Sequence, residues 1–271
     1  MNMKVEANCC RRLLPRGPLC LLLPAFVGLW VPEKGAADAF DQTHARYAAV
    51  LTNYVRNGRV NYARLQAAPQ GLDAYLNDLA AVKPQDFAAW TRENRLALLL
   101  NLYNARTLRL IIDHYPTKSI RSIGVLPGAA WRQLVVRIGG QVMTLDHLEN
   151  SIIRAEYHEP GIHFALVCAA LGCPPLRAEP YVGQRLNEQL DDQAKQFLGL
   201  PEKNRFDAAT QTLWLSPIFS WYKQDFTGVA GSLEEYVRPF LPEESRQALK
   251  RASRVKVRFT DYNWDLNEVK R

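Results

Sequence analysis

The residues best suited to chemistry lie in one short segment with a histidine and two cysteines. It reads His163-Phe-Ala-Leu-Val-Cys168 and continues, after a glycine, with Cys173-Pro-Pro. The apolar run 162–168 is bounded by proline and glycine, which predicts a buried strand. On a strand His163 and Cys168 would face opposite sides, roughly 16 Å apart at about 3.3 Å per residue. Cys173 lies beyond the glycine turn, where the chain can fold back towards His163.

Three interpretations of these cysteines remain open. A disulfide between Cys168 and Cys173 needs only a tight loop and suits an oxidising compartment. Alternatively, Cys173 is a nucleophile with His163 as its base, an arrangement that spacing alone does not show. Two free buried thiols are the third possibility. The spacing of the histidine and cysteines fits zinc sites poorly, so we expect no metal site and no cofactor.

Two asparagines interrupt the longest apolar stretch, Leu96-Ala-Leu-Leu-Leu-Asn101-Leu-Tyr-Asn104. Asn101 and Asn104 are three residues apart and therefore share one helix face. A buried amide without partners costs about 1–3 kcal/mol, so both side chains must be hydrogen-bonded. They either line a ligand cleft or brace the backbone of a loop.

Four further polar or aromatic residues are candidates for a site. Glu149 is a possible acid or base, although an exposed helical carboxylate is its simpler interpretation. Arg177 can bind a carboxylate with two hydrogen bonds, or brace a turn. Trp221 and Asp225 share one side of a predicted helix, which either forms an aromatic-walled ligand site or faces the core.

Hydrophobic periodicity predicts a helix-rich α+β domain with a small mixed or antiparallel sheet, because early helices precede later hairpins. The Gly139-Gly140 pair between two apolar runs predicts a β-hairpin. The predicted helices are 40–57, 71–82, 91–114, 145–157, 184–198, 218–226, 233–240 and 243–252, and the predicted strands are 134–138, 141–144, 162–168, 205–206, 213–215 and 255–259.

The N-terminus has the pattern of a cleavable export signal. Basic residues precede an apolar run from Leu19 to Val31, and Ala37-Asp38-Ala39 offers a cleavage site. The run is too short to span a bilayer comfortably, since spanning needs about 20 residues. We therefore expect residues 1–39 to be removed, residues 40–271 to form one periplasmic or secreted domain, and no stable membrane span to remain.

The composition narrows the possible partners. The whole chain has a net charge of +7, but its basic residues are scattered. This pattern favours weak attraction to anionic surfaces, and export would remove nucleic acid as a partner. The expected partner is a small molecule, a peptide, a glycan or another envelope component.

Several separate motifs, in the same order, resemble the domain of unknown function 547 family. The resemblance covers roughly 61–226 and extends towards 261–264. It implies an exported bacterial protein with no established activity. The chain departs from the family pattern at Leu98–Leu100, where aromatic residues are usual, and at Asn150, where the family often has a histidine. No role of that histidine can be transferred, and Glu149 is only a matching position. The matching motifs are Asn101-Leu-Tyr-Asn104-Ala, His114-Tyr-Pro, Ser119-Ile-Arg, His163 to Cys168, Cys173-Pro-Pro-Leu-Arg177 and Phe219-Ser-Trp-Tyr with Asp225-Phe226.

Two functions of different class follow from these candidates. In the first, a cleft formed by Asn101, Asn104, Arg177, Trp221 and Asp225 binds a peptide, glycan or envelope partner. In the second, the protein is a papain- or transglutaminase-like thiol hydrolase or transferase that uses Cys173, His163 and Asn101 or Glu149. Thiol counting separates them, because a disulfide-bonded Cys173 cannot serve as a resting thiolate.

Overall fold

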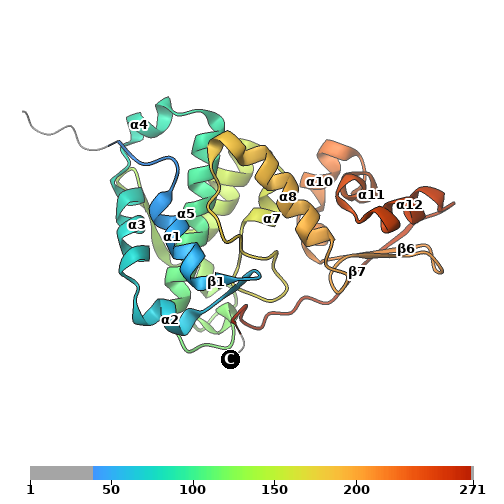
Figure 1. Ribbon diagram of the computed structural model, residues 1–271, viewed down its shortest axis with the longest axis horizontal. Helices are drawn as coiled ribbons and strands as arrows, with labels where there is room; N and C mark the ends of the chain where they lie inside the picture. Colours follow the sequence, from blue (N-terminus) through green and yellow to red (C-terminus); the bar gives the residue numbers. More distant parts are fainter. Residues whose placement is uncertain (1–38, 270–271) are drawn as a thin grey trace, which may run out of the picture. The chain divides into compact units, whose positions relative to one another are not determined.

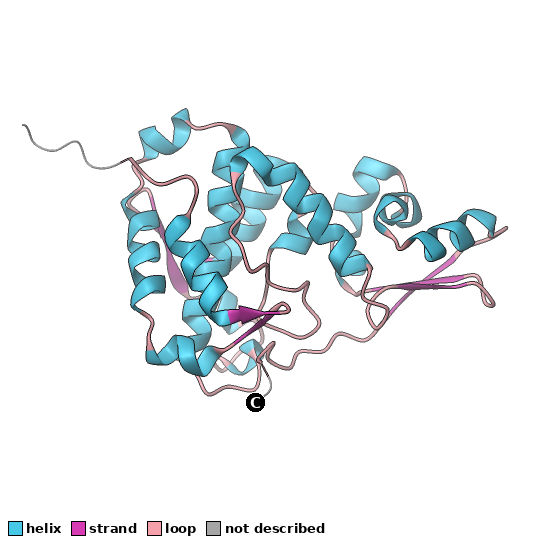
Figure 2. Cartoon of the chain, in the orientation of Figure 1, coloured by secondary structure: helices cyan, strands magenta, loops and turns pink. Residues whose placement is uncertain are grey.

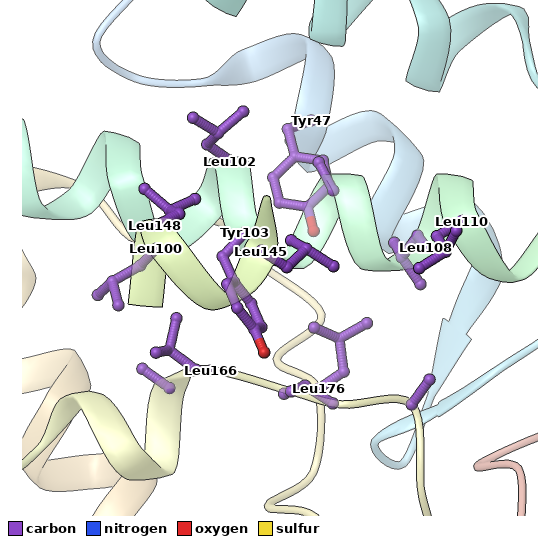
Figure 3. Packing of buried hydrophobic residues seen from close by; sticks show 14 of the residues in the cluster. Tyr47, Leu100, Leu102, Tyr103, Leu108, Leu110, Leu145, Leu148, Leu166 and Leu176 are labelled. Carbon is purple, nitrogen blue, oxygen red and sulfur yellow. The ribbon is translucent and has the colours of Figure 1, made fainter. Parts of the chain in front are cut away.

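A central helix, α5 (Arg92–Asp113), organises the larger hydrophobic core. The computed structural model describes residues 39–269, and the predicted export signal lies outside them apart from Ala39. The Thr91 side chain caps α5 by accepting from Asn94 N–H at 3.2 Å. Residues on all sides of α5 are buried, which is typical of a helix inside a core. Figure 3 shows Leu100, Leu102, Tyr103, Leu108 and Leu110 of α5 among side chains from other segments.

Short helices and one small hairpin pack around α5 at the beginning of the described chain. Their apolar faces join the same core, which includes Tyr47, Leu72 and Leu79. The hairpin turns at Asn57 and Gly58, both with positive φ. These elements are α1 (Ala45–Tyr54), β1 (Val55–Arg56), β2 (Arg59–Val60), α2 (Tyr62–Ala67), α3 (Gln70–Ala81) and α4 (Pro84–Ala89).

The middle of the chain supplies a second hairpin and the helices nearest the candidate site. The predicted hairpin is confirmed, because its strands pair antiparallel around Gly139 and Gly140, which both have positive φ. The helix predicted over 145–157 is mainly a π-helix. The elements are 3-10 helices η1 (Ile120–Ser122) and η2 (Ala129–Arg132), strands β3 (Leu134–Ile138) and β4 (Gln141–Thr144), π-helix η3 (His147–Arg154), and helices α6 (Ala155–Tyr157) and α7 (Ile162–Ala165).

The prediction of a strand over residues 162–168 is wrong. Residues Ile162–Ala165 form the helical turn α7, closed by the Leu166 N–H donating to Ile162 O at 2.9 Å. The chain after α7 runs extended without joining a sheet. The expected strand separation of His163 and Cys168 therefore does not apply.

The last part of the chain builds a second core around Phe164, Phe197 and Phe219. Its sheet has the order β5-β6-β7, antiparallel between β5 and β6 and parallel between β6 and β7. The helix predicted over 218–226 is interrupted at Tyr222. The elements of this part are η4 (Gly183–Arg185), α8 (Leu186–Leu198), β5 (Arg205–Asp207), β6 (Thr212–Leu215), α9 (Ile218–Trp221), α10 (Lys223–Ala230), α11 (Leu233–Val237), η5 (Arg238–Phe240), α12 (Glu243–Arg251) and β7 (Lys256–Phe259). Figure 1 shows β6, β7, α10, α11 and α12 on the side of α8 away from α1 to α3.

The predicted fold class is confirmed. The described residues form many helices and small sheets of two or three strands (Figure 2), which is a helix-rich α+β arrangement.

Candidate functional site

An open cavity of about 420 Å³ brings together segments from distant parts of the chain. We call it the aromatic pocket, because six aromatic side chains line it. Its volume lies within the usual range of about 300–1,000 Å³ for small-molecule sites. The aromatic residues are Tyr103, Trp131, Trp221, Tyr222, Tyr262 and Trp264.

Three of these rings form a continuous wall. The ring centroids of Trp221 and Tyr262 are 4.8 Å apart, and those of Tyr262 and Trp264 are 4.6 Å apart. Trp131 meets Trp264 edge to face at 6.2 Å. Trp221 remains 50% exposed, so its ring is available to a ligand.

Glu149 supplies a carboxyl group to the pocket from η3. The carboxyl is buried, and its Oε1 accepts from the Tyr222 hydroxyl at 2.6 Å. Burial raises the pKa of Glu149, while hydrogen bonds from Tyr222 and Tyr103 partly oppose that rise. Asp146 and Asn150 of the same segment also line the pocket.

His163 lies at the pocket wall in a hydrogen-bonded chain with Asp225 and Arg154. Its Nε2 is 2.8 Å from Asp225 Oδ2, and Arg154 Nε and Nη2 donate to the same carboxylate at 2.5 and 2.9 Å. Hydrogen bonding from Arg154 lowers the pKa of Asp225, and burial lowers the pKa of His163 to about 4. At neutral pH His163 is therefore uncharged. Its Nε2–H donates to the carboxylate, because an ionised carboxylate can only accept.

The imidazole of His163 also stacks on Tyr222, with ring centroids 3.9 Å apart. Because the Tyr222 hydroxyl donates to Glu149, one tyrosine contacts both the histidine and the acid. Asp225 itself does not line the aromatic pocket and instead borders a separate cavity of about 300 Å³.

Cys168 and Cys173 are paired as a disulfide, with Cα atoms 6.3 Å apart. This pairing agrees with the first of the three cysteine interpretations. Cys173 Sγ accepts from the Cys168 N–H at 3.0 Å and from the Tyr262 hydroxyl at 3.1 Å. The Cys173 carbonyl accepts from Lys203 Nζ at 2.7 Å, which fixes the backbone at the same residue.

Two neighbouring segments, 168–173 and 261–266, meet at one isolated antiparallel bridge between Ala170 and Leu266. We call this pair of segments the ribbon; it carries the disulfide and borders both the aromatic pocket and a larger, more polar second cavity of about 1,060 Å³. Its segments also pair through Leu171 N–H to Asp265 O at 2.8 Å and Gly172 N–H to Asn263 O at 2.7 Å. A Cβ at Gly172 would lie 2.9 Å from the Tyr262 ring, so only glycine fits there. Side chains alternate across the ribbon: Tyr262 and Trp264 line the pocket, while Asp261 and Asn263 line the second cavity.

The structure brings together the three predicted catalytic candidates, Cys173, His163 and Glu149, at the aromatic pocket. The predicted ligand-binding set does not converge, since only Trp221 lines this pocket. Arg177 borders the second cavity, where Asp192 and Glu179 pair with it at 2.5 and 2.6 Å.

Asn101 and Asn104 brace backbone rather than face the aromatic pocket. Asn101 donates to Tyr181 O at 2.7 Å and accepts from Tyr181 N–H at 2.9 Å. Asn104 donates to Ala165 O and accepts from Val167 N–H, both at 2.9 Å. Asn104 thus fixes the chain immediately after α7, and with it the segment that carries His163.

Sequence reasoning missed Trp131, Tyr222, Tyr262 and Trp264 as members of one pocket. These residues lie in three separate segments, and no spacing in the sequence relates them. The available signal was the Tyr-x-Trp alternation at 262–264, which on an extended chain puts both rings on one face.

Part of the chain matches a known protein family. Residues 87–198 match the family model described as "Protein of unknown function, DUF547". This part of the chain therefore belongs to that family, as its motifs predicted. The match includes Glu149, His163 and Cys173, and ends before Trp221 and Tyr262. Neither the curated proteins nor the solved structures gave a match.

Between residues 39 and 269, no cluster of three or more His, Cys, Asp or Glu side chains is arranged to hold a metal ion. Over the same residues, no helix has the length and apolar character needed to cross a bilayer.

Proposed function

We propose that this protein is exported to the cell envelope or beyond, and that its aromatic pocket binds a saccharide unit of a glycan. The observation that carries the proposal is the wall of stacked rings around a buried carboxyl in one cavity. Sugar rings present apolar C–H faces to aromatic side chains and hydroxyls to polar ones. The export pattern at the N-terminus supports an envelope ligand.

The polar side of the pocket suits hydroxyl groups. Glu149 supplies carboxyl oxygens that accept hydrogen bonds, and burial raises its pKa. Asn150 supplies an amide and Arg132 supplies donors at the same cavity. A ligand would therefore meet apolar faces on one side and mixed donors and acceptors on the other, as specific small-molecule sites require.

The proposal is tested by titrating the protein with chitotetraose, cellotetraose and maltotetraose. We expect at least one to bind in calorimetry and to change tryptophan fluorescence, because three tryptophans line the pocket. Trp221→Ala should weaken that binding about tenfold through the loss of a stacking face. Glu149→Leu should weaken it as well, because it removes the carboxyl oxygens that accept from ligand hydroxyls.

Trp214→Ala is the matched control for these variants. Trp214 is partly exposed on β6, contacts Arg205 and lies outside the pocket. Its replacement should leave affinity unchanged. Absence of binding by all three oligosaccharides at millimolar concentration, or equal binding by the Trp221 and Trp214 variants, would show that the saccharide proposal is wrong.

A second candidate function, thiol catalysis by Cys173, is favoured by the donors at its sulfur. The Cys168 N–H and the Tyr262 hydroxyl would both stabilise a thiolate, and His163 lines the same pocket. The disulfide must first be reduced: a dithiol supplies two electrons and two protons and becomes a disulfide itself. The freed Cys173 thiol would pass its proton to Nδ1 of the neutral His163 and attack an acyl carbon. The amine or alcohol of the substrate would leave with that proton as the thioester forms, and water would then hydrolyse the thioester and restore the thiol.

Thiol reactivity tests this second candidate. After reduction, Cys173 in the Cys168→Ala variant should alkylate with an apparent pKa below the ordinary value of about 8.5. Tyr262→Phe should raise that pKa by removing one donor. Mass spectrometry of the Cys173 peptide keeps the signal separate from other cysteines in the chain. An apparent pKa at or above 8.5 eliminates thiol catalysis and leaves the saccharide proposal untouched.

A further inference from the structure

An exposed apolar loop lies beside the aromatic pocket, between η1 and η2. Val125 is 98% exposed and Leu126 is 66% exposed. The loop is held at both ends, because Ile123 before it and Ala130 after it are buried in the core. Two neighbouring apolar side chains are therefore held in water at the tip of an anchored loop.

Basic residues surround this tip in the sequence without acidic ones. From 114 to 145 the chain contains Lys118, Arg121, Arg132 and Arg137 and no aspartate or glutamate. All four are exposed, and within residues 39–269 none of them forms an ion pair with a carboxylate. Their charges are available to an anionic partner.

Side-chain contacts hold two of these cations between the tip and the pocket. The Arg121 guanidinium lies 5.1 Å from the centre of the Trp264 ring, and Trp264 lines the pocket. Arg132 lines the pocket and donates from Nη2 to Pro127 O at 2.5 Å, next to Leu126. Arg121, Arg132 and the apolar tip therefore belong to one surface at the edge of the cavity.

We infer that the segment 118–137 docks the protein on an anionic membrane surface. Val125 and Leu126 would enter the headgroup region, and Arg121 and Arg132 would contact lipid phosphates. Each Lys or Arg near an anionic leaflet adds attraction that falls off within a Debye length. Stable protein interfaces bury about 1,200–2,000 Å² in total, far more than two side chains supply, so a lipid surface fits this tip better. Docking here would bring the mouth of the aromatic pocket to the membrane.

Vesicle partitioning of the full chain tests the inference. The protein should bind vesicles of 70% phosphatidylcholine and 30% phosphatidylglycerol more tightly than vesicles of pure phosphatidylcholine. The double variant Val125→Ser and Leu126→Ser should bind at least tenfold more weakly through the loss of apolar burial. Arg121→Gln should reduce binding about fivefold and weaken its dependence on phosphatidylglycerol. Higher salt should weaken binding of the unaltered protein.

Val229→Ser is the matched control, because Val229 is 61% exposed on α10, far along the chain from the loop. It should bind as the unaltered protein does. A second measurement locates the contact: the extra fluorescence of a tryptophan introduced as Leu126→Trp, taken as the difference from the unaltered protein with its six tryptophans, should be quenched by brominated lipid, and that of Val229→Trp should not. Equal partitioning of all variants, no quenching at position 126, or no binding to either vesicle would overturn the inference. Each outcome is separable from glycan binding, which is measured without lipid.

Discussion

Replacing Asn101 by alanine is expected to lower the free energy of unfolding by about 3 kcal/mol. The Asn101 amide satisfies both the N–H and the carbonyl of Tyr181, at a site where the asparagine is only 1% exposed. Removing it leaves two buried backbone groups without partners, each costing about 1–3 kcal/mol. Urea unfolding followed by circular dichroism measures the change.

Asn150→Ala is the comparison for this prediction. The Asn150 amide donates to Asp146 at the protein surface, where water can replace the lost bond. Its replacement should change the free energy of unfolding by less than about 0.5 kcal/mol. A loss below about 1 kcal/mol for Asn101→Ala would mean that water reaches Tyr181 and that the amide is not a brace.

Phe164→Ala is expected to cost about 3–5 kcal/mol of unfolding free energy. Phe164 is fully buried, and its ring centroid lies 5.7 Å from those of Phe197 and Phe219 and 5.8 Å from that of Phe226. It belongs to α7, so its ring joins the segment that carries His163 to the second core. Truncation should leave a cavity at this junction.

Denaturant unfolding checks the size of this effect, and hydrogen exchange checks its location. Faster exchange is expected in α8, α9 and α10, while α1 to α3 should change less because they pack on the other core. Phe259→Ala is the control, since Phe259 is 38% exposed on the edge strand β7. Similar losses for Phe164→Ala and Phe259→Ala would contradict the central role given to Phe164.

Local sequence signals were sufficient for the elements that have a clear turn, cap or hydrophobic pattern. The glycine pair predicted the β3–β4 turn because both positions need positive φ. Thr91 and the long apolar pattern predicted α5 within one residue at each end. The paired strands at 205–207 and 212–215 also followed from alternating residues around a polar turn.

Tertiary contacts decided the elements that sequence patterns misassigned. A short apolar run such as 162–168 has no periodicity that distinguishes a strand from a helical turn. Here the Asn104 amide holds the backbone at Ala165 and Val167, which ends α7 and directs the chain to Cys168. These two hydrogen bonds join residues that are 61 and 63 positions apart in the sequence, so no local pattern reveals them.

The candidate site was predictable in its reactive groups and not in its walls. Cys173, His163 and Glu149 stand out by residue type, and the structure brings them to one cavity. The aromatic wall depends on how η2, α9 and the 262–264 segment pack against one another. Asp225 was predicted to share one side of a helix with Trp221, but its carboxylate instead binds His163 and Arg154 outside the pocket.

The register of the ribbon between the two cavities determines which side chains line each of them. Tyr262 and Trp264 face one cavity, while Asp261 and Asn263 face the other. A one-residue slip in an extended segment turns every side chain to the opposite face. A single insertion or deletion near 261 would therefore exchange the side chains that line the two cavities, giving the smaller one carboxylate and amide groups and the larger one the aromatic rings.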